Sequence, residues 1–195
     1  MPFAVDDGIV VVTIMAKARR LSTDEYFQYP ETTRRMELVY GVVREPPAPR
    51  WGHQTVVTRL TALLESHVRD RDLGRVCVSP VDVVLDVERA LVVQPDIVFI
   101  SAKRMSIVRE RVFGAPDLTI EVLSLGTGLH DRTIKLDWYR TYGVRETWLV
   151  DALSRQVDVI DLAARGEPRS TFEKDDRIRS TVLGDLPIIV SSIFE

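Results

Sequence analysis

Cysteine is nearly absent from this chain of 195 residues, in which Cys77 is the only one. A single cysteine excludes an intrachain disulfide and a zinc site built from several cysteines. This scarcity fits a reducing compartment, so we expect a cytoplasmic protein. Cys77 itself is expected to pack as a small residue within a strand.

An excess of positive charge is also missing. Acidic residues outnumber basic ones by 29 to 26, which leaves a formal net charge of −3. Such a chain has no overall positive field of the kind that drives tight, sequence-independent binding to nucleic acid. Any contact with nucleic acid must therefore come from a local patch or from a bound metal ion.

The apolar stretch Gly8–Met15 is far too short to span a bilayer. It follows two aspartates and precedes basic residues, which reverses the charge order of a signal peptide. We therefore expect no membrane association. Residues 1–20 are interpreted as an N-terminal extension, in which residues 1–14 are either an added edge strand or an over-extended start. Residues 21–195 are expected to form one domain, because single domains commonly reach about 200 residues.

Periodicity and capping signals predict the order of elements. Ser22–Glu25 is a capping box that opens a short helix through Phe27. Met36–Val43 is typical of a hairpin turning near Tyr40–Gly41, although tyrosine is unfavourable at positive φ, so the turn type is left open. Further helices are predicted over 51–72 and 130–142, a helical crossover over 103–111, and strands over 76–85, 91–100, 117–124 and in the C-terminal part from Thr147. The pattern predicts an α/β fold with a mixed central sheet flanked by helices.

Glu121 lies in the middle of the apolar strand-like run Leu118–Leu123. Burying a carboxylate disfavours its charged form by several kcal/mol unless a positive group meets it. Asp96 begins a second apolar run, and Lys135 lies on the helix that follows Glu121. Two acids and a lysine that meet at adjacent strand ends could hold a divalent cation such as Mg²⁺, which prefers oxygen ligands.

Glu37, Asp96, Glu121 and Lys135, in that order, resemble the motif of the PD-(D/E)XK nuclease superfamily. More specifically, the chain is similar to the Uma-two family of restriction-endonuclease-like proteins from about residue 20 to residue 195. The matching pieces are Met36–Gly41, Pro47–His53, Val93–Asp96, Glu121–Ser124, Asp131 with Lys135 and Tyr139, and Tyr142–Asp151.

The resemblance implies a restriction-endonuclease-like fold and a metal-dependent endonuclease that acts on DNA, with a homodimer by analogy. It implies that Asp96 and Glu121 bind Mg²⁺ or Mn²⁺, that Lys135 orients the attacking water, and that Glu37 adds a carboxylate. The superfamily's usual lysine lies two residues after the glutamate, where this chain has Leu123. The family resemblance implies that Lys135 reaches the same place from the following helix.

Each candidate also has a structural interpretation. Asp96 could cap a turn, and Glu121 could form a buried ion pair with Lys135 or Arg132. Lys135 could pair with Asp131 one helical turn before it, although its position beside the apolar stripe of Ile134 and Trp138 would let its stem snorkel towards the strand ends. Glu37 could face solvent on its hairpin. The secondary candidates are His53, which capping or packing would also explain, and Asp131, Arg132 and Tyr139.

Other motifs are excluded. Gly126-Thr-Gly128 lies where a dinucleotide-binding fingerprint would begin, but Asp131 stands in place of the third glycine and would repel a pyrophosphate. The functional prediction is therefore a nuclease, and the alternative is a non-catalytic nucleic-acid-binding or regulatory module of the same fold. In that module the acids would form a structural ion-pair network.

Overall fold

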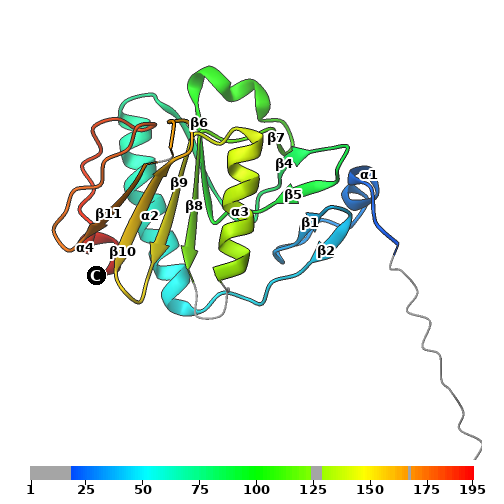
Figure 1. The fold of residues 1–195 in the computed structure, drawn as a ribbon, viewed down its shortest axis with the longest axis horizontal. Coiled ribbons are helices and arrows are strands. Elements are labelled where there is room, and N and C mark those ends of the chain that lie inside the picture. The colour runs from blue at the N-terminus through cyan, green and yellow to red at the C-terminus, as the bar shows by residue number, and fades with distance from the viewer. Residues whose placement is uncertain (1–18, 124–128, 167) are drawn as a thin grey trace, which may run out of the picture.

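The computed structural model describes residues 19–123, 129–166 and 168–195, with residues 129–132 described by their backbone alone. Runs of strands separate the helices through these ranges (Figure 1). The helices are α1 (Thr23–Phe27), α2 (Trp51–Asp70), the 3₁₀ helix η1 (Ala102–Ile107), α3 (Leu129–Tyr142) and α4 (Ser191–Phe194). The strands are β1 (Glu37–Val39), β2 (Val42–Arg44), β3 (Gly74–Val78), β4 (Val83–Asp86), β5 (Leu91–Val93), β6 (Ile97–Ser101), β7 (Val112–Phe113), β8 (Leu118–Leu123), β9 (Glu146–Asp151), β10 (Gln156–Asp161) and β11 (Arg169–Glu173).

A six-stranded sheet has the order β11-β10-β9-β8-β6-β3. β8 and β9 run parallel, whereas the other neighbouring strands run antiparallel. α2 and α3 cover opposite faces of this sheet (Figure 1). The α/β class and the mixed sheet flanked by helices are thus confirmed, and the predicted long helices correspond to α2 and α3.

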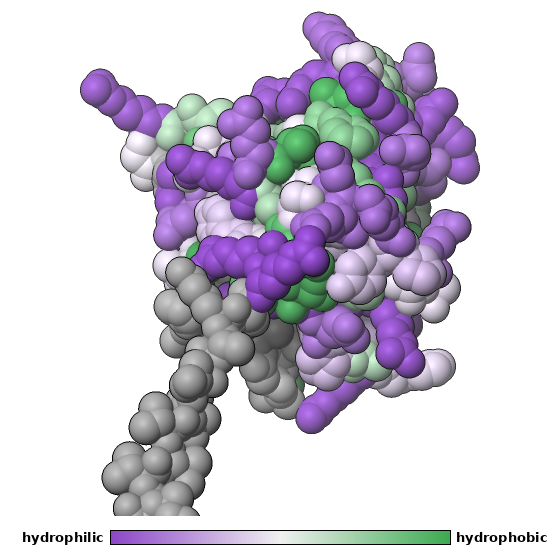
Figure 2. Space-filling view, turned by 90° about the vertical axis from the view of Figure 1, so that its right-hand side faces the viewer, coloured by the Kyte–Doolittle hydropathy of each residue, from purple (hydrophilic) through white to green (hydrophobic). Residues whose placement is uncertain are grey.

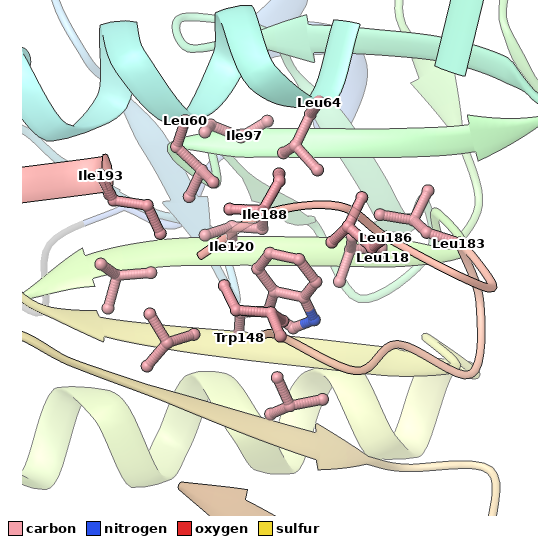
Figure 3. Close-up of a cluster of buried hydrophobic side chains, with 14 of the residues drawn as sticks. Leu60, Leu64, Ile97, Leu118, Ile120, Trp148, Leu183, Leu186, Ile188 and Ile193 are labelled. Atoms are coloured by element: carbon pink, nitrogen blue, oxygen red, sulfur yellow. The ribbon is translucent and has the colours of Figure 1, made fainter. Parts of the chain in front are cut away.

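The main core lies between α2 and the six-stranded sheet. Side chains alternate between the two faces of a strand, so Ile97 and Phe99 of β6 join this core while Val98 and Ile100 join the cluster on the α3 side. Figure 3 shows the core side chains of α2, β8 and β9 together with those of the C-terminal segment. Burying each large aliphatic side chain contributes about 1.5–3 kcal/mol, so this core fixes β6 and β8 beside each other.

A second, five-stranded sheet has the order β2-β1-β5-β4-β7 and is also mixed. The predictions of single strands over 76–85 and 91–100 were wrong, because each run is divided between the two sheets. The first run is interrupted at Pro80 and the second at Pro95, and proline has no N–H to donate to a sheet. The second division matters for function, since it leaves Asp96 where the chain crosses from one sheet to the other.

The N-terminal signals are confirmed. Ser22 and Glu25 form the predicted capping box of α1, and β1 and β2 form the predicted hairpin. Its turn has positive φ at both Tyr40 (49°) and Gly41 (84°), as in a type I′ turn. The Tyr40 ring packs edge-on against Trp138 with 5.9 Å between ring centroids, a contact that offsets the unfavourable backbone conformation.

Three further expectations concern the surface and the chain start. Cys77 does not pack inside but is exposed, because β3 is an edge strand. The predicted extension falls almost wholly outside the described residues, so the boundary at residue 21 stays a prediction. In the described part of the chain no helix combines the length and the apolar character needed to cross a membrane.

Figure 2 shows that hydrophilic residues dominate the face on the side of α1.

Candidate active site

Glu121 lies on the face of β8 that points towards α3. Side chains alternate between the two faces of a strand, so those of Ile120 and Val122 point to the opposite face, where they join the core under α2. The Oε1 atom of Glu121 accepts hydrogen bonds from the hydroxyl of Tyr139 at 2.5 Å and from the ammonium of Lys135 at 3.1 Å. The alternation of side chains along β8 therefore places the carboxylate of Glu121 on the α3 side of the sheet.

Asp96 precedes β6 directly and is 3% exposed. Its Oδ2 atom accepts the backbone N–H of Val122 at 2.7 Å, because β6 and β8 are hydrogen-bonded neighbours. The same oxygen lies 3.2 Å from Nε2 of His53, which α2 supplies from the other side. Asp96 is thus held next to Glu121, and it does more than cap a turn.

Lys135 brings the third acid into the cluster. Its Nζ atom lies 2.9 Å from Oε1 of Glu37 and 3.1 Å from Oε1 of Glu121, and its side chain is 18% exposed. The expected snorkelling of Lys135 towards the strand ends is what the structure shows. Glu37 is buried, so the interpretation that it faces solvent was wrong.

Arg35 also belongs to the cluster, although it is not among the residues predicted from the sequence. Its guanidinium lies 2.7 Å from Oδ1 of Asp96 and 3.9 Å from Oε2 of Glu121, and it also donates to the carbonyl of Gln94. The sequence does contain a signal for Arg35, which lies two residues before Glu37. Residues two apart on an extended chain point to the same side, so the two side chains lie on the same side of the chain.

The secondary candidates divide into two groups. His53 and Tyr139 contact Asp96 and Glu121 respectively, so both join the cluster. The side chains of Asp131 and Arg132 lie outside the described residues, and the alternatives that involve them stay untested.

A cavity of about 510 Å³ opens onto the cluster. Its wall includes Asp96, Glu121 and Lys135, and the segment Pro46–Pro49 forms part of its rim. A second cavity of about 360 Å³ shares that segment and also reaches Asp96. The carboxylates of Asp96 and Glu121 are therefore largely buried in the protein but accessible to a small ligand or a phosphate group.

The family model described as "Uma2: Putative restriction endonuclease" matches residues 23–188. The chain belongs to the Uma2 family. Its fold is similar to the crystal structure of a protein described as a putative nuclease belonging to DUF820, from Anabaena variabilis ATCC 29413, with a TM-score of 0.74 and 20% sequence identity. That match covers 89% of this chain and 97% of the other, and it confirms the restriction-endonuclease-like fold. A search of curated proteins found no match.

In this Uma2 chain the acids and bases shift one another's pKa. Burial alone would lower the pKa of Lys135, but the carboxylates of Glu121 and Glu37 outweigh it and raise that pKa. Burial would raise the pKa of Asp96, yet the hydrogen bond from His53 and the charge of Arg35 hold it below its usual value.

Glu121 is the exception. Burial raises its pKa, Lys135 opposes this, and the neighbouring charge of Asp96 adds to it. Arg35 also opposes the rise, but burial outweighs both cations, so the pKa of Glu121 lies above its usual value and a further cation would favour its ionised form.

Asp96 and Glu121 are the two residues of the cluster that could hold a magnesium ion. The described residues contain no group of three or more His, Cys, Asp and Glu side chains arranged to hold a metal. Two carboxylates suffice for Mg²⁺, which usually keeps several of its waters. A cationic guanidinium already lies against Oδ1 of Asp96 and Oε2 of Glu121, so this space suits a positive group.

Proposed function

We propose that this chain is a metal-dependent endonuclease that hydrolyses phosphodiester bonds of DNA. The observation that carries the proposal is the meeting of Asp96, Glu121 and the Lys135 ammonium at the wall of one cavity. Membership in a family described as putative restriction endonucleases supports this assignment.

The residues would divide the work as follows. Asp96 and Glu121 would hold Mg²⁺ or Mn²⁺ through their carboxylate groups. A bound divalent ion supplies charge neutralisation at the phosphate and a more acidic water. The backbone N–H of Val122 and the ring of His53 fix the other oxygen of Asp96, so the carboxylate is oriented before any ligand arrives.

Lys135 would act through its charge. Because Glu121 and Glu37 raise its pKa, the ammonium stays protonated at neutral pH and cannot accept a proton from water. It can orient the attacking water by hydrogen bonding and stabilise the negative oxygens that develop on the phosphate. Glu37 would position Lys135, since its Oε1 atom lies 2.9 Å from the Nζ atom of Lys135.

The cavity lining bears on the substrate, and the need to cut two strands bears on the assembly. Arg44 and Arg50 also line the cavity, so their guanidinium groups can meet a phosphate backbone despite the net charge of −3. Cleavage of both strands of a duplex would require two sites, and we therefore propose a homodimer. Sedimentation with and without a short duplex tests that assembly.

The test of the function is nicking of supercoiled plasmid by the wild type and by Lys135→Ala, with Mg²⁺, Mn²⁺ or EDTA in parallel. We expect nicking by the wild type that requires the metal and that the variant loses. Wild-type protein that is folded and yet inactive under every metal condition would contradict the proposal.

One observation favours the alternative of a non-catalytic module. Each of the three carboxylates already contacts a cationic side chain, as expected of a structural ion-pair network. Thermal melting separates the two functions, because a metal that binds only the folded state must raise the melting temperature. A melting temperature that does not respond to Mg²⁺ or Mn²⁺ would favour the module.

A further inference from the structure

We propose that Arg35 is an internal counter-ion that occupies the metal position and must be displaced when a divalent cation binds. This inference rests on the proposed function, because it assigns the metal to the same pair of carboxylates. It adds a residue that controls when the site is loaded.

The geometry separates the four carboxylate oxygens of Asp96 and Glu121 into two kinds. Oδ2 of Asp96 is fixed by the backbone N–H of Val122, and Oε1 of Glu121 is fixed by Lys135 and Tyr139. The other two oxygens, Oδ1 and Oε2, face the guanidinium of Arg35, at 2.7 and 3.9 Å. These are the oxygens left for a metal, so the metal and the guanidinium compete for one place.

The guanidinium cannot leave this place by losing its charge. Arginine stays protonated in proteins, so a dication that arrived beside it would be repelled unless the side chain moved. The side chain has room to respond, because it is 19% exposed and lines both cavities. Arg35 is therefore a positioning residue. It contacts the carboxylates of both Asp96 and Glu121 and keeps them together until the metal replaces it.

The resting arrangement of Arg35 is also incompletely satisfied. Its Nε atom is buried and has no hydrogen-bond partner among the described residues. An unsatisfied buried donor reduces the stability of the resting contact. The contact with Glu121 is long for a charge-assisted hydrogen bond, which usually measures about 2.7–2.9 Å. Both features favour exchange over a permanent structural bridge.

The test is calorimetric titration of Mn²⁺ into the wild type, Arg35→Ala and Arg35→Lys, with Arg34→Ala as the matched control. Arg34 is an exposed arginine next in the chain and lines the second cavity, but among the described residues it forms no ion pair with Asp96 or Glu121. Its loss therefore removes the same charge without removing a contact of these carboxylates. We expect Arg35→Ala to bind Mn²⁺ about tenfold more tightly, because a competing charged hydrogen bond is removed. Arg35→Lys should fall in between, since a single ammonium cannot bridge both carboxylates. The control should stay within about twofold of the wild type.

A second measurement separates competition from a change in packing. Guanidinium chloride at about 10 mM, far below denaturing concentrations, should weaken Mn²⁺ binding to Arg35→Ala, while the same concentration of NaCl should not. If Arg35→Ala does not fold, Arg35→Lys carries the test with its intermediate affinity.

The outcomes distinguish this inference from the proposed function. Equal or weaker Mn²⁺ binding by the Arg35 variants, in a wild type that binds Mn²⁺ and nicks DNA, overturns the counter-ion role alone. Absence of Mn²⁺ binding by every variant overturns both proposals. Binding by Arg35→Ala and not by the wild type would support the counter-ion role in its strongest form.

Discussion

Strand β8 has buried carboxylates near both ends, and the two ends hold them differently. At its beginning Asp117 and Glu146 are fully buried, and Glu146 lies opposite Leu118 on the parallel neighbour β9. Towards its end Asp96 is buried and Glu121, with a side chain 13% exposed, is partly buried beside a cavity. We call these pairs the structural end and the site end of β8.

At the structural end the protein itself occupies every carboxylate oxygen. Glu146 accepts from Trp148 Nε1 and Ser180 Oγ with one oxygen, and from the N–H and hydroxyl of Thr181 with the other. Asp117 accepts the N–H of Ser101 and contacts Arg104 and Arg145.

At the site end two oxygens face a movable guanidinium next to open space. Burial of an acid alone therefore does not mark a catalytic site. The distinguishing features are Oε2 of Glu121, whose contact with Arg35 is long at 3.9 Å among the described residues, and the cavity beside these carboxylates.

The largest expected effect is on cleavage at the site end. Glu121→Gln or Asp96→Asn should reduce metal-dependent nicking by about a thousandfold, because each removes a charged ligand while preserving shape. Urea unfolding should show a loss of about 1–2 kcal/mol for Asp96→Asn, because Arg35 and His53 lose their charged partner, and a smaller loss for Glu121→Gln, whose charged form burial already disfavours. The matched control is Glu146→Gln, which should nick DNA normally wherever it remains folded; a similar loss of nicking in this control would erase the distinction between the two ends.

At the structural end the largest effect falls on stability. Glu146→Ala should lower the free energy of unfolding by about 3 kcal/mol, because the donors on Trp148, Ser180 and Thr181 lose their acceptors in the interior. Urea denaturation measures this loss. A change below about 1 kcal/mol would mean that water replaces the carboxylate and that this end is not a structural anchor.

Asp117 gives a pH-dependent version of the same comparison. Burial would raise its pKa, but the N–H of Ser101 and the charge of Arg104 hold it below the usual value. The stability this carboxylate contributes is therefore fully present above its unfolded pKa of about 3.9 and is lost as the pH falls through the lower folded value. Asp117→Asn should cost about 1–2 kcal/mol at pH 7, and its difference from the wild type should shrink below about pH 4. A difference that is constant between pH 7 and pH 3 would contradict this account.

The smallest expected effect concerns Tyr139. Tyr139→Phe removes the hydroxyl that orients Glu121 but leaves both carboxylates and Lys135 in place. Nicking should fall about fivefold, which corresponds to about 1 kcal/mol for one hydrogen bond. Rate measurements at saturating Mn²⁺ should show it, and a loss as large as that of Glu121→Gln would place Tyr139 in the reaction itself.

Much of this fold could be predicted because local signals are strong. The capping box at Ser22 and the helical spacing of α2 and α3 depend on neighbours in the chain. The convergence of Glu37, Asp96, Glu121 and Lys135 was also foreseen, with the family resemblance supplying the link between distant residues. Their chemical roles remain predictions.

The rest depended on contacts that sequence does not encode locally. Nothing in the apolar runs 76–85 and 91–100 says that each serves two sheets, since that depends on which strands lie beside them. Glu146 also borders an apolar strand, so sequence alone does not separate it from Glu121; only their hydrogen-bond partners do. Arg35 was missed because its role depends on Asp96, 61 residues away.

The most direct test of the central claim is the anomalous difference map of a crystal soaked in Mn²⁺. We predict a peak at the carboxylates of Asp96 and Glu121, with the guanidinium of Arg35 displaced from Oδ1 of Asp96. A soaked crystal without a peak there and with Arg35 still against Asp96 would contradict it.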